Sequence, residues 1–356
     1  MKLCMPEYYK KFKCTAEKCS DNCCIGWEID IDDVTFSKYN KINSDFGKKL
    51  NENICKGKQK SFILDNNERC PFLNNENLCE IFIKLGENNL CKICTEHPRY
   101  YEWFDGIKEG GIGLCCEEAA RIILSENKKF STYTIDIPTE DCDEYDNSIY
   151  LYIKNARNKI IDYLDNCSLP LELKIRNILL FSEELQTNID TNNLKPVNFT
   201  FKEEVLNVLH NKEPIFDFFL TLESLDNNWI PYLKDCISTY NTYKYRVQDF
   251  KKYSYELPHY LKNISIYFIW RYFLKGVFDS DVLSKAKLFV VSILMLETLF
   301  FNKWLETGTL SLNDCVSIVK NYSKEIEYSE ENLLTLKKAF NTLDIFSVKN
   351  LSNFFT

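Results

Sequence analysis

The stretch Cys14-Thr-Ala-Glu-Lys-Cys19-Ser-Asp-Asn-Cys23-Cys24 places four thiols within eleven residues. Twelve of the sixteen cysteines of the chain precede residue 117. Core packing seldom requires so many thiols, so this density needs either a disulfide framework or a metal site to explain it. The N-terminal third is therefore the part of the chain that decides how the rest is organised, and we expect its chemistry to lie there.

Composition and charge exclude several classes of protein. The chain has 356 residues, 45% of them hydrophobic, and a net charge of -8, whereas a nucleic-acid binder usually shows a basic face. No apolar segment of a secretory signal precedes Cys14. The best apolar run, Leu288 to Leu296, has about nine residues, and a membrane span needs about 18. We expect a cytoplasmic protein without nucleic-acid or membrane partners; the sequence does not indicate an oligomeric state.

The expected compartment favours metal over disulfides. Thiols are kept reduced in the cytosol, so a cysteine-dense domain there is more often metal-binding or catalytic than cross-linked. A disulfide framework is the alternative.

The pattern of the chain changes after its first third. Residues 1–127 are rich in loops and glycines and form the predicted cysteine-rich, metal-binding domain. The polar range 128–147 is the predicted linker, and 148–356 is the predicted helical domain. The expected fold class is mainly α, with the loop-rich N-terminal domain packed on the α-helical C-terminal domain.

Short elements are expected within the cysteine-rich domain. Helices are predicted at Asp32 to Tyr39, with Asp32 or Asp33 as N-cap, and around Glu117 to Ser125. The segments Arg69 to Leu73 and Leu78 to Ile83 are predicted to be extended pieces on either side of a turn.

Helical spacing dominates the second half. Apolar residues from Ile149 to Leu164 keep one face of a helix, and Ser168 with Pro170 begins another. Ser311 and Ser329 are predicted as N-caps of the last two helices. Further helices are predicted at Phe201 to Asn211, Tyr260 to Phe278 and Leu283 to Trp304. The single cysteines of this half, Cys167, Cys236 and Cys315, are interpreted as small buried hydrophobic residues.

The predicted metal site is almost entirely sulfur. Thiolates bind zinc or iron–sulfur clusters, and His97 is the one histidine in this domain. Spacing alone is compatible both with zinc bound by four cysteines and with a [4Fe-4S] cluster. The thiols expected to contribute are Cys14, Cys19, Cys23, Cys24, Cys70, Cys79, Cys91, Cys94, Cys115 and Cys116.

The adjacent pairs Cys23-Cys24 and Cys115-Cys116 constrain this site. Neighbouring side chains of an extended chain point to opposite faces, so both members of a pair do not easily bind one metal. We expect one ligand from each pair, with the other thiol structural, reactive or part of a second site. One metal site and two are both open.

The segment from Cys94 to Trp103 is the predicted contact strip for a cofactor or substrate. Arg99 has the geometry to bind a carboxylate, and Tyr100, Tyr101 and Trp103 are of the type that surrounds a cation. Trp27 has the same interpretation. The alternative is that these aromatic side chains shield the metal site from water.

The glycines of Gly110-Gly-Ile-Gly113 lead directly into Cys115-Cys116. No apolar strand precedes them, so we interpret them as a flexible approach to the metal site in preference to a nucleotide-binding loop.

These motifs together resemble the flagellin lysine-N-methylase (FliB-like) family. More distantly they resemble small cysteine-rich proteins described as zinc- or iron-chelating. The residues that carry the resemblance are Phe12-x-Cys14-x4-Cys19-x3-Cys23-Cys24-x-Gly26-Trp27, Cys70-Pro-Phe-Leu73, Leu78-Cys79, Leu85-Gly86-Glu87, Leu90-Cys91-x2-Cys94, His97-Pro-Arg99 and Cys115-Cys116.

The resemblance implies methyl transfer from S-adenosylmethionine to lysines of flagellin by a protein with an iron–sulfur cluster. It favours [4Fe-4S] over zinc as the metal, and it leaves polar and radical transfer open. It supplies no catalytic base; Glu102, Glu117 and Glu118 are candidates by their position near the expected ligands. The alternative functions are a non-enzymatic, metal-stabilised protein-binding module and the same methyltransferase scaffold acting on another protein or peptide.

Overall fold

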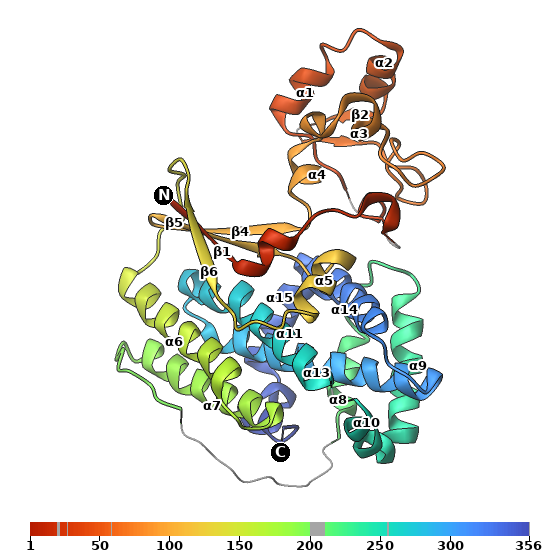
Figure 1. Cartoon of the computed structure of the whole chain (residues 1–356). Helices are drawn as coiled ribbons and strands as arrows, with labels where there is room; N and C mark the ends of the chain where they lie inside the picture. Colours follow the sequence, from red (N-terminus) through yellow and green to blue (C-terminus); the bar gives the residue numbers. More distant parts are fainter. Residues whose placement is uncertain (20–21, 27, 58, 200–210, 255, 356) are drawn as a thin grey trace.

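The structure, a computed structural model, describes residues 1–19, 22–26, 28–57, 59–199, 211–254 and 256–355. The fold is mainly helical, as expected. A helical body forms the lower part of the molecule, a small cysteine-rich lobe stands above it, and a four-stranded sheet lies on the body beside the lobe (Figure 1). Trp27 and all but the last residue of the helix predicted at Phe201 to Asn211 lie outside the described residues.

The helical body is built around α13 (Val282–Thr307), most of whose side chains are buried. Its sequence is apolar on nearly every face, which is typical of a buried helix, and other helices pack on several sides of it. The helices predicted from Ile149 and Leu283 onward are confirmed. The helix predicted to start at Ser168 has Pro170 as its N-cap residue, and the helix predicted at Tyr260 to Phe278 ends at Tyr272, where a 3-10 turn leads into α12 (Gly276–Asp279). The other helices of the body are α6 (Asn147–Asn166), α7 (Leu171–Asp190), α8 (Glu213–Phe219), α9 (Trp229–Tyr243), α10 (Val247–Tyr253), α11 (Leu257–Tyr272), α12 (Gly276–Asp279), α14 (Leu312–Glu327), α15 (Glu330–Thr342) and α16 (Val348–Ser352).

Both predicted serine caps are confirmed. The Ser311 hydroxyl accepts from the backbone N–H of Asp314, and the Asp314 carboxylate accepts from the backbone N–H of Ser311 at 2.8 Å. This reciprocal pair satisfies two amides that the first turn of α14 leaves without helical partners. Ser329 caps α15 by accepting from the N–H of Asn332 at 3.1 Å.

The sheet was not expected from the sequence. Its strand order is β4 (Arg99–Phe104), β5 (Ile107–Ile112), β1 (Lys2–Pro6) and β6 (Thr132–Asp136). The β4–β5 pair is an antiparallel hairpin, β1 runs parallel to β5, and β6 is antiparallel to β1. Strands separated by more than a hundred residues therefore pair, and no local sequence pattern predicts which strands become partners.

Two predictions are corrected by this sheet. Part of the predicted linker 128–147 forms β6, whose β-branched and aromatic residues suit a strand. The glycines Gly110 and Gly111 belong to buried strand β5 and are not a flexible approach to a metal site. Glycine is required at both positions because the rings of Tyr100 and Tyr101 occupy the space that a Cβ would fill.

The cysteine-rich lobe has a small core of its own, separate from that of the helical body. Tyr39, Leu50, Phe62 and Phe72 are among its buried members. The predicted helix at Asp32 to Tyr39 is confirmed, with the Asp32 carboxylate accepting from the N–H of Thr35 at 2.9 Å. The elements of the lobe are α1 (Asp33–Tyr39), α2 (Asp45–Glu52), β2 (Ile54–Lys56), β3 (Lys60–Phe62), α3 (Glu80–Leu85) and α4 (Lys92–Glu96).

The extended segment predicted at Leu78 to Ile83 is wrong. Cys79 is the N-cap residue of α3, and Gly86 ends the helix at a positive φ of 83°. This short, largely apolar run predicts an extended segment because six helical residues are too few to display the helical period.

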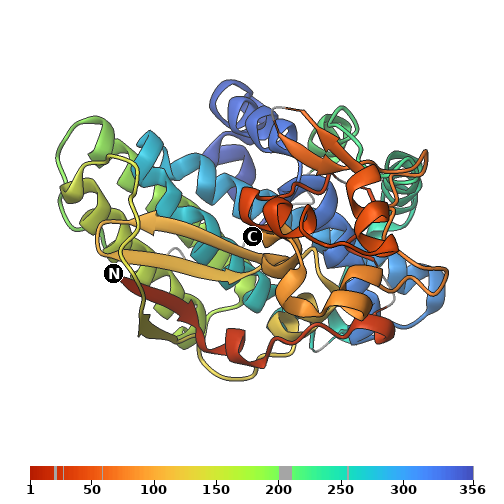
Figure 2. The ribbon, with the colours of Figure 1, turned by 90° about the horizontal axis from the view of Figure 1, so that it is seen from above.

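The sheet is fastened to the helical body by buried polar contacts. Arg157 of α6 donates to both carboxylate oxygens of Glu109 in β5, at 2.5 and 2.7 Å. The indole N–H of Trp270 in α11 donates to the carbonyl oxygen of Gly110 at 3.1 Å. Seen from above, β4 and β5 run across the helical body toward the lobe (Figure 2). The hairpin thus connects the two parts of the molecule.

Candidate functional site

Five thiols of the lobe lie close enough together that a charge on one alters the pKa of its neighbours. We call Cys24, Cys70, Cys79, Cys91 and Cys94 the lobe thiol group. The sulfurs of Cys91 and Cys94 are 3.9 Å apart. The backbone N–H of Cys70 donates to the carbonyl oxygen of Cys24 at 3.0 Å, which joins two of the segments that carry these thiols.

Backbone N–H groups point at several of these sulfurs. Cys79 is the N-cap residue of α3, and the N–H groups of Ile81 and Phe82 act to lower the pKa of its thiol, as that of Phe72 does for Cys70. Cys91 occupies the same N-cap position at α4. Amide donors and helix N-termini favour the thiolate over the thiol, which is the form that binds metals.

Burial works against ionisation of the same thiols. It raises the pKa of Cys70 to about 12 and also raises that of Cys79. The pKa of Cys94 is raised by its hydrogen bond to Cys91 and then by burial, while the pKa of Cys91 is lowered by the same bond. Because a bound metal cation supplies the missing positive charge, coordination would deprotonate these thiols.

The lobe thiol group fits a thiolate-bound metal in donor type. The 3.9 Å between Cys91 and Cys94 matches the edge, about 3.8 Å, of a tetrahedron of thiolates about 2.3 Å from a zinc ion. Across the described ranges, no group of three or more His, Cys, Asp or Glu side chains is already arranged to hold a metal ion. The lobe therefore supplies suitable donors, and metal binding would have to draw them together.

A second set of thiols connects the lobe to α5 (Glu117–Leu124). Cys116 is the N-cap residue of this helix, the N–H groups of Glu118 and Ala119 act to lower the pKa of its thiol, and it lies within electrostatic range of Cys19 and Cys23. Burial raises the pKa of Cys116 to about 12. The predicted helix around Glu117 to Ser125 is confirmed by α5.

The two adjacent pairs behave differently. Cys115 is buried, and the hydroxyl of Tyr328 hydrogen bonds to its thiol, whereas the thiol of Cys116 lies near Cys19 and Cys23. Burial raises the pKa of Cys115 to about 12. The thiols of Cys23 and Cys24 instead hydrogen bond to each other, so this pair stays on one side of the chain. Of the remaining predicted ligands, Cys14 is exposed.

A buried polar cluster lies behind Cys115, at the junction of the hairpin and the helical body. One carboxylate oxygen of Glu327, Oε2, accepts from the hydroxyls of Tyr267 and Tyr272, both at 2.8 Å, and from Arg271 at 3.0 Å. The other oxygen, Oε1, is buried and has no hydrogen-bond partner among the described residues. We call Tyr267, Arg271, Tyr272, Glu327 and Tyr328 the junction cluster.

Sequence reasoning missed the junction cluster. The signal that was available is Arg271, a charged residue within the apolar and aromatic run from Tyr267 to Phe273. A charge on a buried helix needs a partner, and Glu327 supplies it from α14, 56 residues away. Nothing local to either residue identifies the other.

The structure divides the predicted contact strip between the two faces of β4. Tyr100 faces the helical body, where its ring lies 4.6 Å from the guanidinium of Arg271. Tyr101 and Trp103 lie on the opposite face, because side chains alternate along a strand. There they flank the ammonium of Lys108, at 4.7 and 4.4 Å from the ring centroids. The cations that these aromatic rings contact are therefore cations of the protein itself.

Arg99 is on the same face as Tyr101. Its Nε donates to the hydroxyl of Tyr9 at 2.7 Å, and its guanidinium lies 5.1 Å from the ring of Phe12. These contacts hold the segment that leads to Cys14 against the hairpin. Arg99, Tyr100 and Trp103 are not brought to one cavity.

The candidate carboxylates are all ion-paired. Glu102 lies 2.9 Å from the ammonium of Lys275, and Arg121 pairs with Glu117 at 3.3 Å and Glu118 at 3.4 Å. Glu117 also lies 3.9 Å from the sulfur of Cys19, which places it beside the second set of thiols.

Comparison with known proteins bears on the helical body. A family model described as the FliB lysine N-methylase C-terminal domain matches residues 157–354. The chain belongs to the FliB lysine N-methylase family. The junction cluster and most of α6 to α16 lie inside the matched range, whereas the thiols of the lobe lie outside it.

Curated relatives are similar over about a third of the chain. The flagellar biosynthetic protein FliU of Salmonella muenchen is 28% identical over 149 residues, 36% of this chain and 86% of that protein. The lysine-N-methylases of Salmonella typhimurium and Salmonella choleraesuis are each 28% identical over 132 residues. These matches cover 34% of this chain and only 32% of either enzyme. No solved structure matches the chain.

Among the helices of the described residues, none is both long and apolar enough to cross a membrane.

Proposed function

We propose that this protein is an S-adenosylmethionine-dependent protein lysine N-methyltransferase with a [4Fe-4S] cluster, and that flagellin is its substrate. The observation that carries the proposal is the family match over residues 157–354. Relatives named lysine-N-methylase and flagellar biosynthetic protein support the reaction and a flagellar substrate. Zinc is the alternative metal, and a reducing cytoplasmic compartment is the proposed location, since it keeps the ligand thiols available.

The lobe thiol group would hold the metal. When bound, the cluster supplies Lewis-acid or electron-transfer chemistry, and S-adenosylmethionine supplies the methyl group. Amide donors to Cys70 and Cys79 would stabilise the bound thiolates. Cys23 and Cys116 extend this set toward α5, so the second set of thiols is the place for a further ligand.

The proposed acceptor site is the junction between the lobe and the helical body. A lysine must lose its proton before it attacks a methyl group, and its ordinary pKa is about 10.4. Partial burial lowers that pKa, and a nearby carboxylate takes up the proton. Glu117 is the proposed proton acceptor, because it is partly exposed and lies beside Cys19, whereas the side chain of Glu327 has no exposed surface.

Transfer of a labelled methyl group tests the activity. We expect label from S-adenosylmethionine to appear on flagellin lysines, and Cys94→Ser to abolish transfer without unfolding the helical body. Cys55→Ser is the matched control, because Cys55 is exposed in β2 and belongs to neither set of thiols. If metal-loaded wild-type protein transfers no label to flagellin, the proposed reaction is wrong.

The metal has a test of its own. Protein purified without oxygen should be brown and contain about four irons per cluster. Colourless protein with stoichiometric zinc would contradict the proposed [4Fe-4S] cluster. It would not contradict metal binding by the lobe thiol group.

A further inference from the structure

A cavity lies at the opposite end of α5 from Cys116. It has a volume of about 410 Å³ and is formed by the 3-10 helix η1 (Glu7–Lys11), the chain between α5 and β6, and α11. A helix of eight residues is about 12 Å long, so the cavity is well separated from the thiols at the start of α5. Its volume is in the range of small-molecule sites.

The walls of the cavity combine an apolar floor with a positive rim. Tyr8, Ile123, Phe130 and Ile266 supply the apolar and aromatic surface. Four lysines and two glutamates line it, which leaves two positive charges in excess in a chain whose net charge is -8. The lysines are Lys10, Lys11, Lys128 and Lys129, and the glutamates are Glu7 and Glu126.

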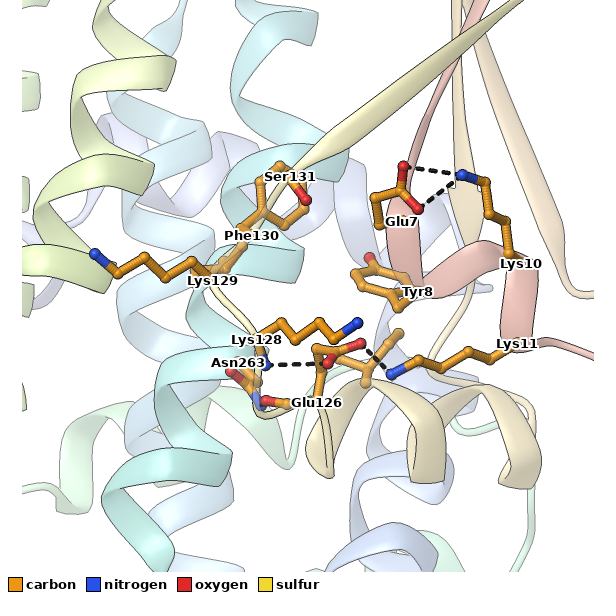
Figure 3. A pocket seen from close by; sticks show the side chains of 12 residues that line it. Glu7, Tyr8, Lys10, Lys11, Glu126, Lys128, Lys129, Phe130, Ser131 and Asn263 are labelled. Atoms are coloured by element: carbon orange, nitrogen blue, oxygen red, sulfur yellow. Dashed lines mark hydrogen bonds and ion pairs between the residues drawn. The ribbon is translucent and has the colours of Figure 1, made fainter.

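Three of the four lysines already have partners. Lys10 pairs with Glu7 at 2.8 Å, and Lys11 pairs with Glu126 at 2.5 Å. Lys129 donates to the side chain of Asn166 on α6 and points away from the cavity (Figure 3). The ammonium of Lys128 points toward Tyr8 and Glu126 and donates no hydrogen bond to any described residue (Figure 3). Lys128 is therefore the cation available to a ligand.

Tyr8 contributes its ring, not its hydroxyl, to the cavity. Its side chain is 7% exposed and lines the cavity. The hydroxyl is closed to solvent and lies within electrostatic range of the buried Tyr100 hydroxyl, so it faces the interior of the protein. The polar group that the cavity offers to a ligand is therefore the Lys128 ammonium.

We propose that this cavity binds a small amphipathic anion, whose apolar body lies against Tyr8, Phe130 and Ile266. Its carboxylate, sulfonate or phosphate head would accept from the Lys128 ammonium. The ligand is neither of the substrates proposed above. The sulfonium of S-adenosylmethionine and the ammonium of a lysine would both be placed among like charges here. The proposal is therefore independent of methyl transfer.

Binding of anilinonaphthalene sulfonate, an aromatic body with one sulfonate, tests the proposal on the full-length, metal-loaded protein. We expect saturable fluorescence enhancement with one site per chain. Lys128→Gln should weaken binding about tenfold, or about 1.4 kcal/mol, because it removes the charged donor to the sulfonate. Lys129→Gln is the matched control, because it removes the same charge from the next residue, and we expect less than a twofold effect.

Competition separates the charge of the ligand from its apolar surface. Octanoate should displace the probe, and octanol at the same concentration should not. Absent or unsaturable binding would overturn the proposal. So would equal weakening by the two lysine variants, or displacement by octanol as effective as displacement by octanoate. Because the readout is binding, these outcomes do not depend on whether the protein methylates flagellin.

Discussion

Glu327 and Arg271 show how single residues hold the junction together. The side chain of Glu327 is fully buried, and that of Arg271 is 11% exposed. Their mutual attraction offsets the cost of removing both charges from water only while both are present. The aromatic rings around Arg271 add cation–π contacts, at 4.6 Å for Tyr100 and 5.1 Å for Tyr272.

Glu327→Gln should lower the free energy of unfolding by about 3–5 kcal/mol, because it leaves Arg271 buried without a compensating charge. Urea denaturation followed by circular dichroism measures this. The double variant Arg271→Met, Glu327→Leu should lose less than the single one, since no charge is then stranded. A double variant less stable than Glu327→Gln would contradict this account.

The buried Lys287 makes the stability of the protein depend on pH in the alkaline range. Its ammonium is buried and donates to the carbonyl oxygen of Phe340 at 2.6 Å, and burial lowers its pKa. Between that lowered value and the ordinary value of about 10.4, the unfolded chain binds more protons than the folded chain. The contribution of this group to stability therefore rises with pH in that window.

Lys287→Met should accordingly reduce the gain in stability as pH rises toward about 10.4. The measurement is the free energy of unfolding in urea at a series of pH values. Lys303→Met is the control on the same helix, where the lysine is 30% exposed and pairs with Glu306. If stability depended on pH in the same way in wild type and Lys287→Met, burial would not lower the pKa of this lysine.

At the scale of elements, β5 is shaped by what packs on it. The hydroxyl and ring of Tyr100 occupy the position that a Cβ on Gly111 would take, with Cζ at 2.5 Å from it. Tyr100 cannot easily move, because its ring also packs against Tyr267 and Arg271. Strand β5 can therefore approach the junction cluster only if residue 111 is glycine.

Gly111→Ala should lower the free energy of unfolding by about 1–3 kcal/mol, the usual cost of forcing extra volume into a packed site. Thermal unfolding measures it. Gly57→Ala is the control, since the nearest atom to its added Cβ is at 3.4 Å, and it should change stability by less than about 0.5 kcal/mol. Equal effects at the two glycines would contradict the packing argument.

Helix starts are the second feature at this scale. Cys79, Cys91 and Cys116 each occupy the N-cap position of a helix, where a serine or aspartate is more usual. Backbone N–H groups of the first turn lower the pKa of the Cys79 and Cys116 thiols against the effect of burial. This arrangement orients the thiols and also explains why α3 and α4 carry no ordinary capping signal.

In the whole molecule, two hydrophobic cores differ greatly in size. The core of the lobe has ten buried residues among those described, whereas the helical body has one continuous core from α5 to the C-terminal helices. A core as small as that of the lobe seldom holds a domain together without a metal or disulfides. The lobe is therefore the part whose stability should depend on the proposed metal.

Removal of metal by a strong chelator under reducing conditions should unfold the lobe and spare the helical body. Hydrogen exchange measured by mass spectrometry should show lost protection around Leu50 and Phe72, with α13 unchanged. Equal protection of the lobe before and after chelation would mean that its core is sufficient without metal.

The sequence alone determined the helical character of the second half and several helix starts, because helical periodicity and caps are local. The caps at Asp32, Ser311 and Ser329 are examples. Only the tertiary structure decided the sheet, the division of the Arg99–Trp103 strip between two faces, the separation of Cys115 from Cys116, and the junction cluster. Each of these depends on contacts between segments distant in the chain, such as Glu109 with Arg157 and Arg271 with Glu327, for which the chain carries no local signal.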